Sequence, residues 1–272
     1  SLCDWSSDVC SSDLIPWART QSLSIYEQLQ AGIRYFDLRV WYKNTGISQG
    51  FYICHALSCC EVQVVLDDVA RFIKENDKEI IILDFHAFMM SQPSVLGEME
   101  HAILMKKIAT AFEGKLIPNS VGINVTVDDI WEKNQQVLVL YAWEKLKDPS
   151  EQYPNFWLES EYVFNSWSYK SNAQGTPSEI KEQSQKAFEN RKNNGNENKF
   201  FILGGTISAT NSLVEGTFSP GKPSSLKDVA ANLNPQFLDW VKNDWADENL
   251  NIITIDFFDQ TDFIEIAIEL NK

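Results

Sequence analysis

Long hydrophobic runs and basic residues are both scarce in this sequence. The longest strongly apolar stretch is residues 137–143, far shorter than the ~20 residues that a helix needs to span a bilayer. Lys and Arg total 23 against 38 Asp and Glu, which gives a formal net charge of −15. A general nucleic-acid binder needs a basic face, so this balance argues against one. It also argues against adsorption to anionic membranes through bulk charge.

Cysteine and histidine are also few, and the chain begins without a leader-like segment. The five cysteines show neither zinc-site spacing nor a disulfide framework, which indicates a reducing cytosol. The first residues lack the basic start and apolar run of a secretory signal peptide. We therefore expect a cytoplasmic protein without a transmembrane segment. The histidines are His55, His86 and His101, and His101 is expected on the surface of a predicted helix.

Apolar residues are numerous enough for one large core. The 272 residues are 44% hydrophobic, and a single (β/α) barrel takes ~250 residues. Residues 1–14 (SLCDWSSDVCSSDL) are instead rich in serine and aspartate and resemble a translated sequencing adaptor. We expect this segment to be non-native, with a genuine disordered tail as the alternative, and the folded domain to span residues 15–272.

Helical and strand patterns alternate from residue 15 onward. Short runs rich in β-branched and aromatic residues predict strands at 33–40, 51–54, 79–85, 136–141, 162–167, 200–207 and 251–257. Periodic patterns predict helices at 62–73, within 96–112, and at 178–190, 237–245 and 262–270. Strands alternating with helices favour a parallel sheet, and a closed barrel of this kind needs eight strands. We therefore predict an α/β fold, a distorted (β/α)8 TIM-type barrel that lacks its first strand, ahead of a helix beginning near Ser22.

Polar side chains recur near the carboxyl ends of four predicted strands. In residues 33–40 the alternation places Tyr35, Asp37 and Arg39 on one side, opposite a wholly apolar set. The other strand ends carry His55, Asp84 with His86, and Asp256. Barrel active sites are built at the carboxyl ends of the strands. We therefore expect these ends to meet at one mouth, with Asp37, Arg39, His55 and Asp256 in one pocket.

Taken singly, each residue has a plainer structural interpretation. A salt bridge inside the barrel would explain Asp37 and Arg39, and a loop cap would explain Asp84. The histidines would be core or loop side chains. Trp167 suits the core as well as it suits the wall of a pocket for a ring-shaped substrate. The convergence of four strand ends is what favours a functional site.

One run of residues is highly specific. It reads WARTQS at residues 17–22 and AGIRYFDLRV at 31–40, and it is accompanied by His55, IILDF at 81–85, residues 131–141 and IITIDF at 252–257. Together these segments resemble the X-domain of phosphatidylinositol-specific phospholipase C, over essentially all of residues 15–271. The closest resemblance is to the small X-domain-containing proteins that lack accessory lipid-binding modules.

The resemblance implies a phosphodiesterase that cleaves an inositol phospholipid at a membrane surface. The inositol 2-hydroxyl attacks phosphorus, diacylglycerol leaves, and a cyclic inositol phosphate forms, with one histidine as general base and a second as general acid. His55 matches the general acid, although Ala56 stands where family members usually have glycine. Asp37 would position Arg39 or the general acid, and Asp256 would orient the base.

Arg39 bears on metal use. Calcium-dependent members of the family have a carboxylate ligand where bacterial enzymes have an arginine, and Arg39 matches the arginine. Its fixed charge can stabilise the phosphorane without a metal ion. We therefore expect no cofactor and no metal ion, calcium included. Asp84, His86 and Trp167 are expected to bind the substrate.

The base histidine of the family lies in a Gly-Ser/Thr-His-Asp-Ser motif ahead of the WARTQS segment, and no histidine precedes residue 17 here. We expect a native upstream segment to supply it and the chain without it to turn over lipid poorly. A barrel that binds lipid or phosphoinositide without turnover is the alternative. A glycerophosphodiesterase would need a Glu and Asp metal cluster beside a first-strand histidine, and no matching motif is present.

Overall fold

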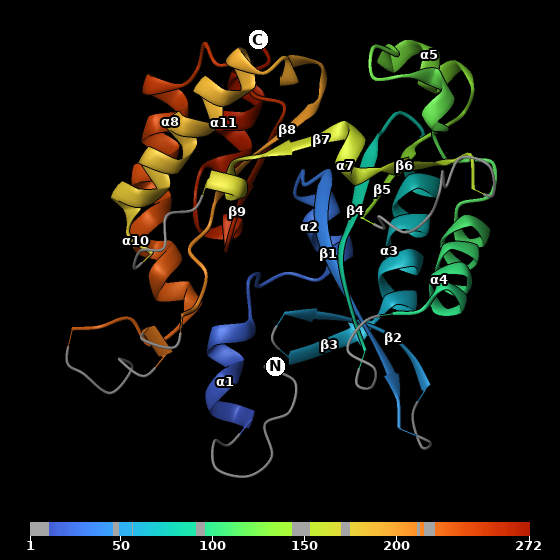
Figure 1. Cartoon of the computed structure of the whole chain (residues 1–272), viewed down its shortest axis with the longest axis horizontal. Coiled ribbons are helices and arrows are strands. Elements are labelled where there is room, and N and C mark those ends of the chain that lie inside the picture. Colours follow the sequence, from blue (N-terminus) through green and yellow to red (C-terminus); the bar gives the residue numbers. More distant parts are fainter. Residues whose placement is uncertain are drawn as a thin grey trace. The chain divides into compact units, whose positions relative to one another are not determined.

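The computed structural model of the chain describes residues 11–45, 49–55, 57–90, 96–142, 153–169, 175–210, 213–214 and 221–272. The described residues divide into two compact units, one of residues 24–162 and one of residues 11–23 and 163–272 (Figure 1). Most of the segment expected to be non-native, residues 1–10, lies outside the described residues. Its last four residues begin helix α1 (Ser11–Ala18), so its origin stays a prediction.

The first unit is built on a mixed six-stranded sheet in the order β3-β2-β1-β4-β5-β6. Its strands are β1 (Tyr35–Asn44), β2 (Gln49–His55), β3 (Leu57–Glu61), β4 (Ile81–Met90), β5 (Val137–Tyr141) and β6 (Phe156–Leu158). Its helices are α2 (Ile25–Gln30), α3 (Val62–Glu75), α4 (Glu98–Ala111), η1 (Asn119–Val121), α5 (Val127–Glu132) and α7 (Glu159–Tyr162). Strands β1, β4, β5 and β6 run parallel.

The parallel prediction is wrong for β2 and β3. Strand β2 pairs antiparallel with β1, and β3 pairs antiparallel with β2. The reason is the short connection of residues 45–48, because parallel neighbours need a crossover of about a dozen residues or more. Strand β1 also continues to Asn44, four residues beyond the predicted end. Strands β3 and β6 were not predicted, since five and three residues are too short to show a period.

The core of the first unit lies between the sheet and helices α3 and α4. All six residues of the predicted apolar face of α3 are buried: Val62, Val65, Leu66, Val69, Phe72 and Ile73. The five residues of β5 are buried as well. Full burial of such side chains stabilises the fold by about 1.5–3 kcal/mol each. The predicted capping box of α2 is also present, with Ser24 accepting from the Glu27 amide and donating its own amide to the Glu27 carboxylate.

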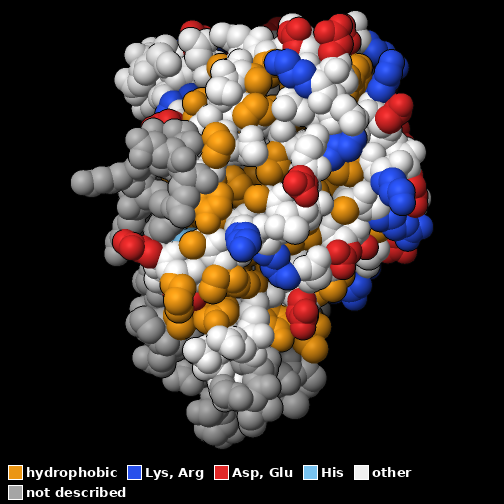
Figure 2. All heavy atoms as spheres, turned by 90° about the vertical axis from the view of Figure 1, so that its right-hand side faces the viewer, with side chains coloured by type: hydrophobic (Ala, Val, Ile, Leu, Met, Phe, Trp, Pro, Cys, Tyr) orange, Lys and Arg blue, Asp and Glu red, His pale blue; other side chains and the backbone are white. Residues whose placement is uncertain are grey.

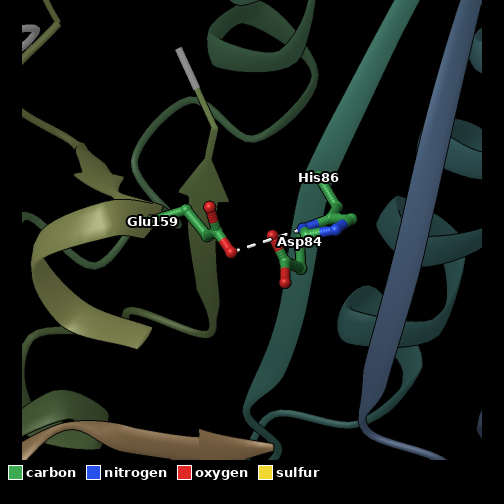
Figure 3. A group of neighbouring side chains, drawn as sticks. All are labelled: Asp84, His86 and Glu159. Carbon is green, nitrogen blue, oxygen red and sulfur yellow. Dashed lines mark ion pairs between the residues drawn. The ribbon is translucent and has the colours of Figure 1, made fainter. Parts of the chain in front are cut away.

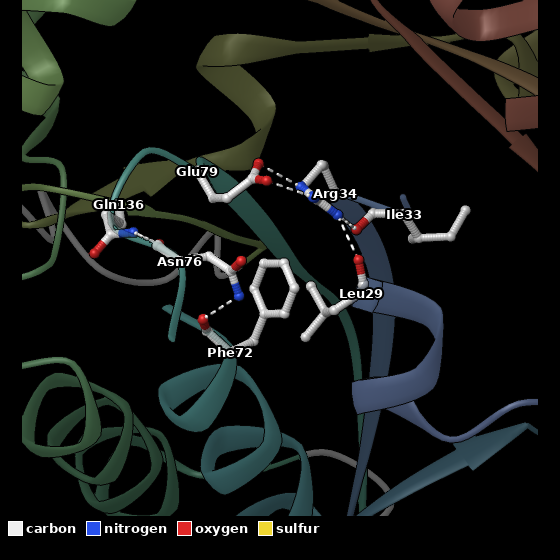
Figure 4. Close-up of polar contacts among 7 residues, drawn as sticks. All are labelled: Leu29, Ile33, Arg34, Phe72, Asn76, Glu79 and Gln136. Atoms are coloured by element: carbon white, nitrogen blue, oxygen red, sulfur yellow. Dashed lines mark hydrogen bonds and ion pairs between the residues drawn. The ribbon is translucent and has the colours of Figure 1, made fainter. Parts of the chain in front are cut away.

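A polar network holds the amino ends of the central strands (Figure 4). The Arg34 guanidinium donates to both carboxylate oxygens of Glu79 at 2.8 Å and to the carbonyl oxygen of Leu29 at 2.7 Å. It also lies over the Phe72 ring, 4.8 Å from the ring centroid. The Arg34 guanidinium, ion-paired with Glu79 and stacked on Phe72, thus connects α2 and α3 to the starts of β1 and β4.

The second unit holds the parallel strands β7 (Val163–Asn165), β8 (Phe200–Gly205) and β9 (Ile252–Ile255), in that order. Its helical elements are α1, η2 (Ser166–Tyr169), α8 (Pro177–Asn193), η3 (Asn196–Asn198), α10 (Leu226–Asp239), the π-helix η5 (Trp240–Asp244), η6 (Phe258–Gln260) and α11 (Phe263–Glu269). The WARTQS segment is hydrogen-bonded to the end of β9 and the residues after it. The Thr20 carbonyl oxygen accepts from the Phe257 amide, and Gln21 Nε2 donates to the Ile255 carbonyl oxygen.

The α/β class is confirmed. The described strands form two sheets, and closure into one barrel stays a prediction.

The surface carries charges of both signs around apolar patches. Figure 2 shows one face on which hydrophobic side chains gather among acidic and basic ones. Exposed large hydrophobic residues include Val64 on α3 and Met99 and Ile103 on α4. In the described part of the chain, no helix has both the length and the apolar character required to cross a membrane.

Candidate active site

The central feature of the candidate site is a pair of facing carboxylates on β1 and β4. Asp37 and Asp84 are direct partners in the parallel register of the two strands. Along β1, Tyr35, Asp37 and Arg39 are half-buried and alternate with buried apolar residues, as predicted. The Tyr35 hydroxyl donates to Asp84 Oδ2 at 2.7 Å, and Arg39 Nη2 lies 3.4 Å from Asp37 Oδ2. The predicted salt bridge is therefore present beside a second, fully buried carboxyl group.

His86 occupies a break in the register of β4. Leu38 pairs with Phe85, but the next residue, Arg39, pairs with Ala87, so His86 is an extra residue in β4. Such a bulge bends a strand and re-aims its side chain. His86 Nδ1 consequently lies 3.3 Å from Glu159 Oε1, at the start of α7 (Figure 3). The sequence did not reveal Glu159, because it follows a three-residue strand that leaves no periodic signal.

Burial and neighbouring charges shift the proton affinities at this site. Burial raises the pKa of Asp84 to about 7, the nearby Glu159 and Asp37 charges add to the shift, and the Tyr35 hydrogen bond opposes it. The pKa of His86 is raised, first by its hydrogen bond with Glu159, and burial acts in the opposite direction. The Tyr35 hydroxyl has a pKa well above its usual value, chiefly because of burial. Near neutral pH, Asp84 and His86 can therefore both hold protons.

His55 is the last residue of β2 and is half-buried. The register between β1 and β2 ends at the pair Val40 and Ile53. His55 lies two residues beyond that pair and itself pairs with Leu57 of β3, so its predicted nearness to Asp37 and Arg39 stays a prediction. The neighbouring position Ala56 lies outside the described residues. The first unit thus places five of the predicted site residues on adjacent strands: Asp37, Arg39, His55, Asp84 and His86.

Asp256 and Trp167 belong to the second unit. Asp256 directly follows β9 and is half-buried, and its carbonyl oxygen accepts from Asn234 Nδ2 at 2.8 Å. Trp167 packs flat against β8, where a Cβ atom on Gly204 would lie 2.1 Å from the indole Nε1. The indole is half-buried, which suits either predicted role. The predicted grouping of Asp256 with Asp37, Arg39 and His55 stays a prediction, because each unit is described by itself.

The expected surface position of His101 is wrong. Its side chain is 1% exposed, and its Nδ1 lies 2.9 Å from the Tyr141 hydroxyl. Burial lowers the pKa of His101 to about 4. The signal was available in the sequence, because His101 precedes Leu104, Met105 and Ile108 by three, four and seven residues on one helix face.

Comparison with solved structures identifies the fold. The chain superimposes on a mutant phosphatidylinositol-specific phospholipase C from Staphylococcus aureus with a TM-score of 0.66 and 14% identity, covering 97% of this chain and 87% of that one. The phosphatidylinositol-specific phospholipase C from Listeria monocytogenes gives a TM-score of 0.60 and 18% identity, covering 97% and 88%. The fold is therefore that of the bacterial phosphatidylinositol-specific phospholipases C.

Comparison with protein sequences then defines the family. The family model described as PI-PLC X matches residues 15–271. PI-PLC X domain-containing protein 2 of Mus musculus is 32% identical over 257 residues, which cover 94% of this chain and 69% of that protein. PI-PLC X domain-containing protein 3 of Homo sapiens is 27% identical over 256 residues, covering 94% and 74%. The chain belongs to the PI-PLC X domain family, which confirms the resemblance.

Proposed function

We propose that this protein is a phosphoric diester hydrolase that cleaves an inositol phospholipid to diacylglycerol and a cyclic inositol phosphate. The observation that carries the proposal is the paired Asp37 and Arg39 beside the buried Asp84, at one place on a phospholipase C-like fold. Phosphoryl transfer needs a positioned positive charge that stabilises the phosphoryl oxygens in the transition state, and groups that accept and donate protons.

The proposed chemistry assigns one proton transfer to each side of the phosphorus. The inositol 2-hydroxyl oxygen forms a bond to phosphorus while its proton passes to a base histidine. The bond between phosphorus and the diacylglycerol oxygen breaks as His55 donates a proton to that oxygen. Arg39 stabilises the negative charge on the phosphoryl oxygens, and Asp37 holds the guanidinium in place. Asp256 orients the base.

Asp84, His86 and Trp167 are proposed to bind the substrate. A protonated Asp84 can donate to one inositol hydroxyl, and its ionised form can accept from it, because its pKa lies at about 7. The half-buried Trp167 indole offers a flat apolar wall to the inositol ring. No metal ion takes part in this scheme, since Arg39 provides the positive charge.

The proposal includes a closed (β/α)8 barrel in which a strand upstream of residue 15 pairs with β1 and β9. Two observations support it. Residues 35–39 of β1 pair only with β4 among the described strands, and β9 pairs only with β8. The same segment would carry the base histidine. We place the protein in the cytoplasm, with transient contact to membranes that contain its substrate.

The test compares the chain preceded by its native upstream segment with the chain that begins at residue 15. Both are assayed on phosphatidylinositol in mixed micelles, with vesicle binding measured in parallel. We expect the longer protein to release diacylglycerol at least about 10²-fold faster, the contribution of one positioned base. Vesicle binding without turnover by the longer protein would contradict the enzyme proposal and indicate a lipid-binding barrel.

A further inference from the structure

Three side chains of the first unit converge on one point that the proposed reaction leaves without a cation. They are Asp84 and His86 on β4 and Glu159 at the start of α7 (Figure 3). One ligand atom from each residue lies within 4.8 Å of the other two. The group offers one imidazole nitrogen and two carboxylates, a donor set that suits first-row divalent cations such as zinc.

One carboxylate oxygen of Asp84 is available as a ligand atom in this group. The side chain is completely buried, and Tyr35 donates to its Oδ2. Its Oδ1 has no hydrogen-bond partner within the part of the chain that the structure describes. Leaving a buried carboxylate oxygen unpaired costs free energy, about 1–3 kcal/mol or more. Figure 3 shows the Asp84 carboxylate next to the line that joins His86 and Glu159, where a bound cation would satisfy it.

A bound divalent cation would also balance the charge of the deprotonated group. Arg39 is engaged with Asp37. Within the described ranges, no lysine or arginine forms an ion pair with Asp84 or Glu159, and His86 alone faces both carboxyl groups. When a metal ion displaces the protons of Asp84 and His86, two carboxylates and a neutral imidazole carry a net charge of −2, which a divalent ion balances.

We infer that Asp84, His86 and Glu159 bind one zinc ion or a similar first-row divalent cation. Ligand atoms bonded to zinc at 2.0–2.2 Å lie about 3.4 Å apart in a tetrahedral site. The 3.3 Å between His86 Nδ1 and Glu159 Oε1 already has this spacing, and a carboxylate oxygen of Asp84 lies within 4.8 Å of a ligand atom of each of the other two residues. A water molecule completes the tetrahedron. The site lies between β4 and α7, and metal binding there does not require that the protein hydrolyse lipid. In the zinc-bound protein, Asp84 and His86 would contact the substrate through the ion and its water molecule rather than directly.

The test measures metal binding directly, on protein that has first been stripped of metal. Calorimetric titration with Zn²⁺ is expected to show one site, and Glu159→Gln is expected to weaken it at least about tenfold. Glu161→Gln is the matched control, because Glu161 lies in the same helix and is exposed. His86→Gln is a second ligand variant, and thermal unfolding without metal identifies any variant that does not fold.

Among the described residues, Cys54, Cys59 and Cys60 are the thiols that could compete as zinc ligands. To distinguish thiol ligands from the proposed ligands, Co²⁺ is substituted for Zn²⁺ in the unmodified protein and its absorption spectrum is measured. Thiolate ligands produce an intense near-ultraviolet charge-transfer band, whereas nitrogen and oxygen ligands do not. Visible bands without the thiolate band support the proposed site. The proposal is overturned by absence of binding, by a thiolate spectrum, or by a folded Glu159→Gln protein that binds zinc as tightly as the Glu161→Gln control.

Discussion

Asp37 and Asp84 face each other on the adjacent parallel strands β1 and β4, and each has a different partner. Asp37 lies 3.4 Å from Arg39, whereas Asp84 accepts from the Tyr35 hydroxyl and has a pKa raised to about 7 by burial. The two neighbouring carboxyl groups thus have different environments, since Asp37 is ion-paired and Asp84 is completely buried. The permanently charged Arg39 and the carboxyl group of Asp84, which can hold a proton, therefore lie on adjacent strands.

Replacing Arg39 with lysine should reduce turnover of phosphatidylinositol by about 10²–10³-fold, because an ammonium cannot reproduce the guanidinium fork that faces the phosphoryl oxygens. Arg71→Lys is the control, since Arg71 pairs with Glu75 on the exposed side of α3. The measurement is kcat on mixed micelles for the protein with its native upstream segment. Similar rates for the two variants would remove Arg39 from the proposed mechanism.

Calcium removal should leave that same activity unchanged. In the proposed mechanism Arg39 provides the positive charge at the phosphoryl group, and it is already paired with Asp37. Diacylglycerol release is measured with EGTA and enough Zn²⁺ to occupy the site inferred above, and again after excess calcium is added to protein kept in the same Zn²⁺ concentration. Activity that appears only when calcium is added would contradict this expectation.

Gly204→Ala should destabilise the second unit. The new methyl group would lie 2.1 Å from the Trp167 indole nitrogen, so either the ring or β8 must move. Overpacking of this kind costs about 1–3 kcal/mol of unfolding free energy. Gly50→Ala is the control, because its nearest contact would be an ordinary 3.6 Å to Tyr52. Urea unfolding followed by tryptophan fluorescence measures both, and equal stabilities would show that the indole yields without cost.

Glu79→Gln should lower the unfolding free energy by about 1–2 kcal/mol, since the Arg34 fork would lose its charged partner. The two side chains are about a third exposed, so solvent screening keeps the effect below that of a buried pair. Glu182→Gln removes one carboxylate from the exposed pair with Lys186 and should change stability by less than about 0.5 kcal/mol. Chemical unfolding of the two variants decides whether the Arg34 network is structural.

His101 should make the fold sensitive to acid. Its pKa is about 4 in the folded protein and about 6.5 when unfolded, so between these values only the unfolded state gains a proton. This contribution to stability is fully present above pH 6.5 and is lost as the pH falls toward 4, by about 3 kcal/mol at most. His101→Gln should therefore lose less stability than the wild type between pH 7 and pH 5. Parallel slopes in urea unfolding would show that another group dominates.

Local patterns were sufficient for much of the fold. The alternation of β1 and the apolar face of α3 were readable because each period repeats within a few residues. The shared side of Tyr35, Asp37 and Arg39 followed from that alternation. Their predicted strand-end position, and that of Asp84 and His86, is wrong, because β1 continues to Asn44 and β4 to Met90. The direction of β2 was not readable from its own residues, since a strand has the same period in either direction and only the short connection decides it.

Contacts between distant segments came from tertiary structure alone. The bulge at His86 arises where β4 shifts its register against β1, and the meeting of His86 with Glu159 requires α7 to follow a strand of only three residues. The raised pKa of Asp84 likewise depends on its burial among Tyr35 and Glu159, which no sequence window contains. Residue type and period are local properties, whereas burial, pairing and charge balance are decided by which segments pack together.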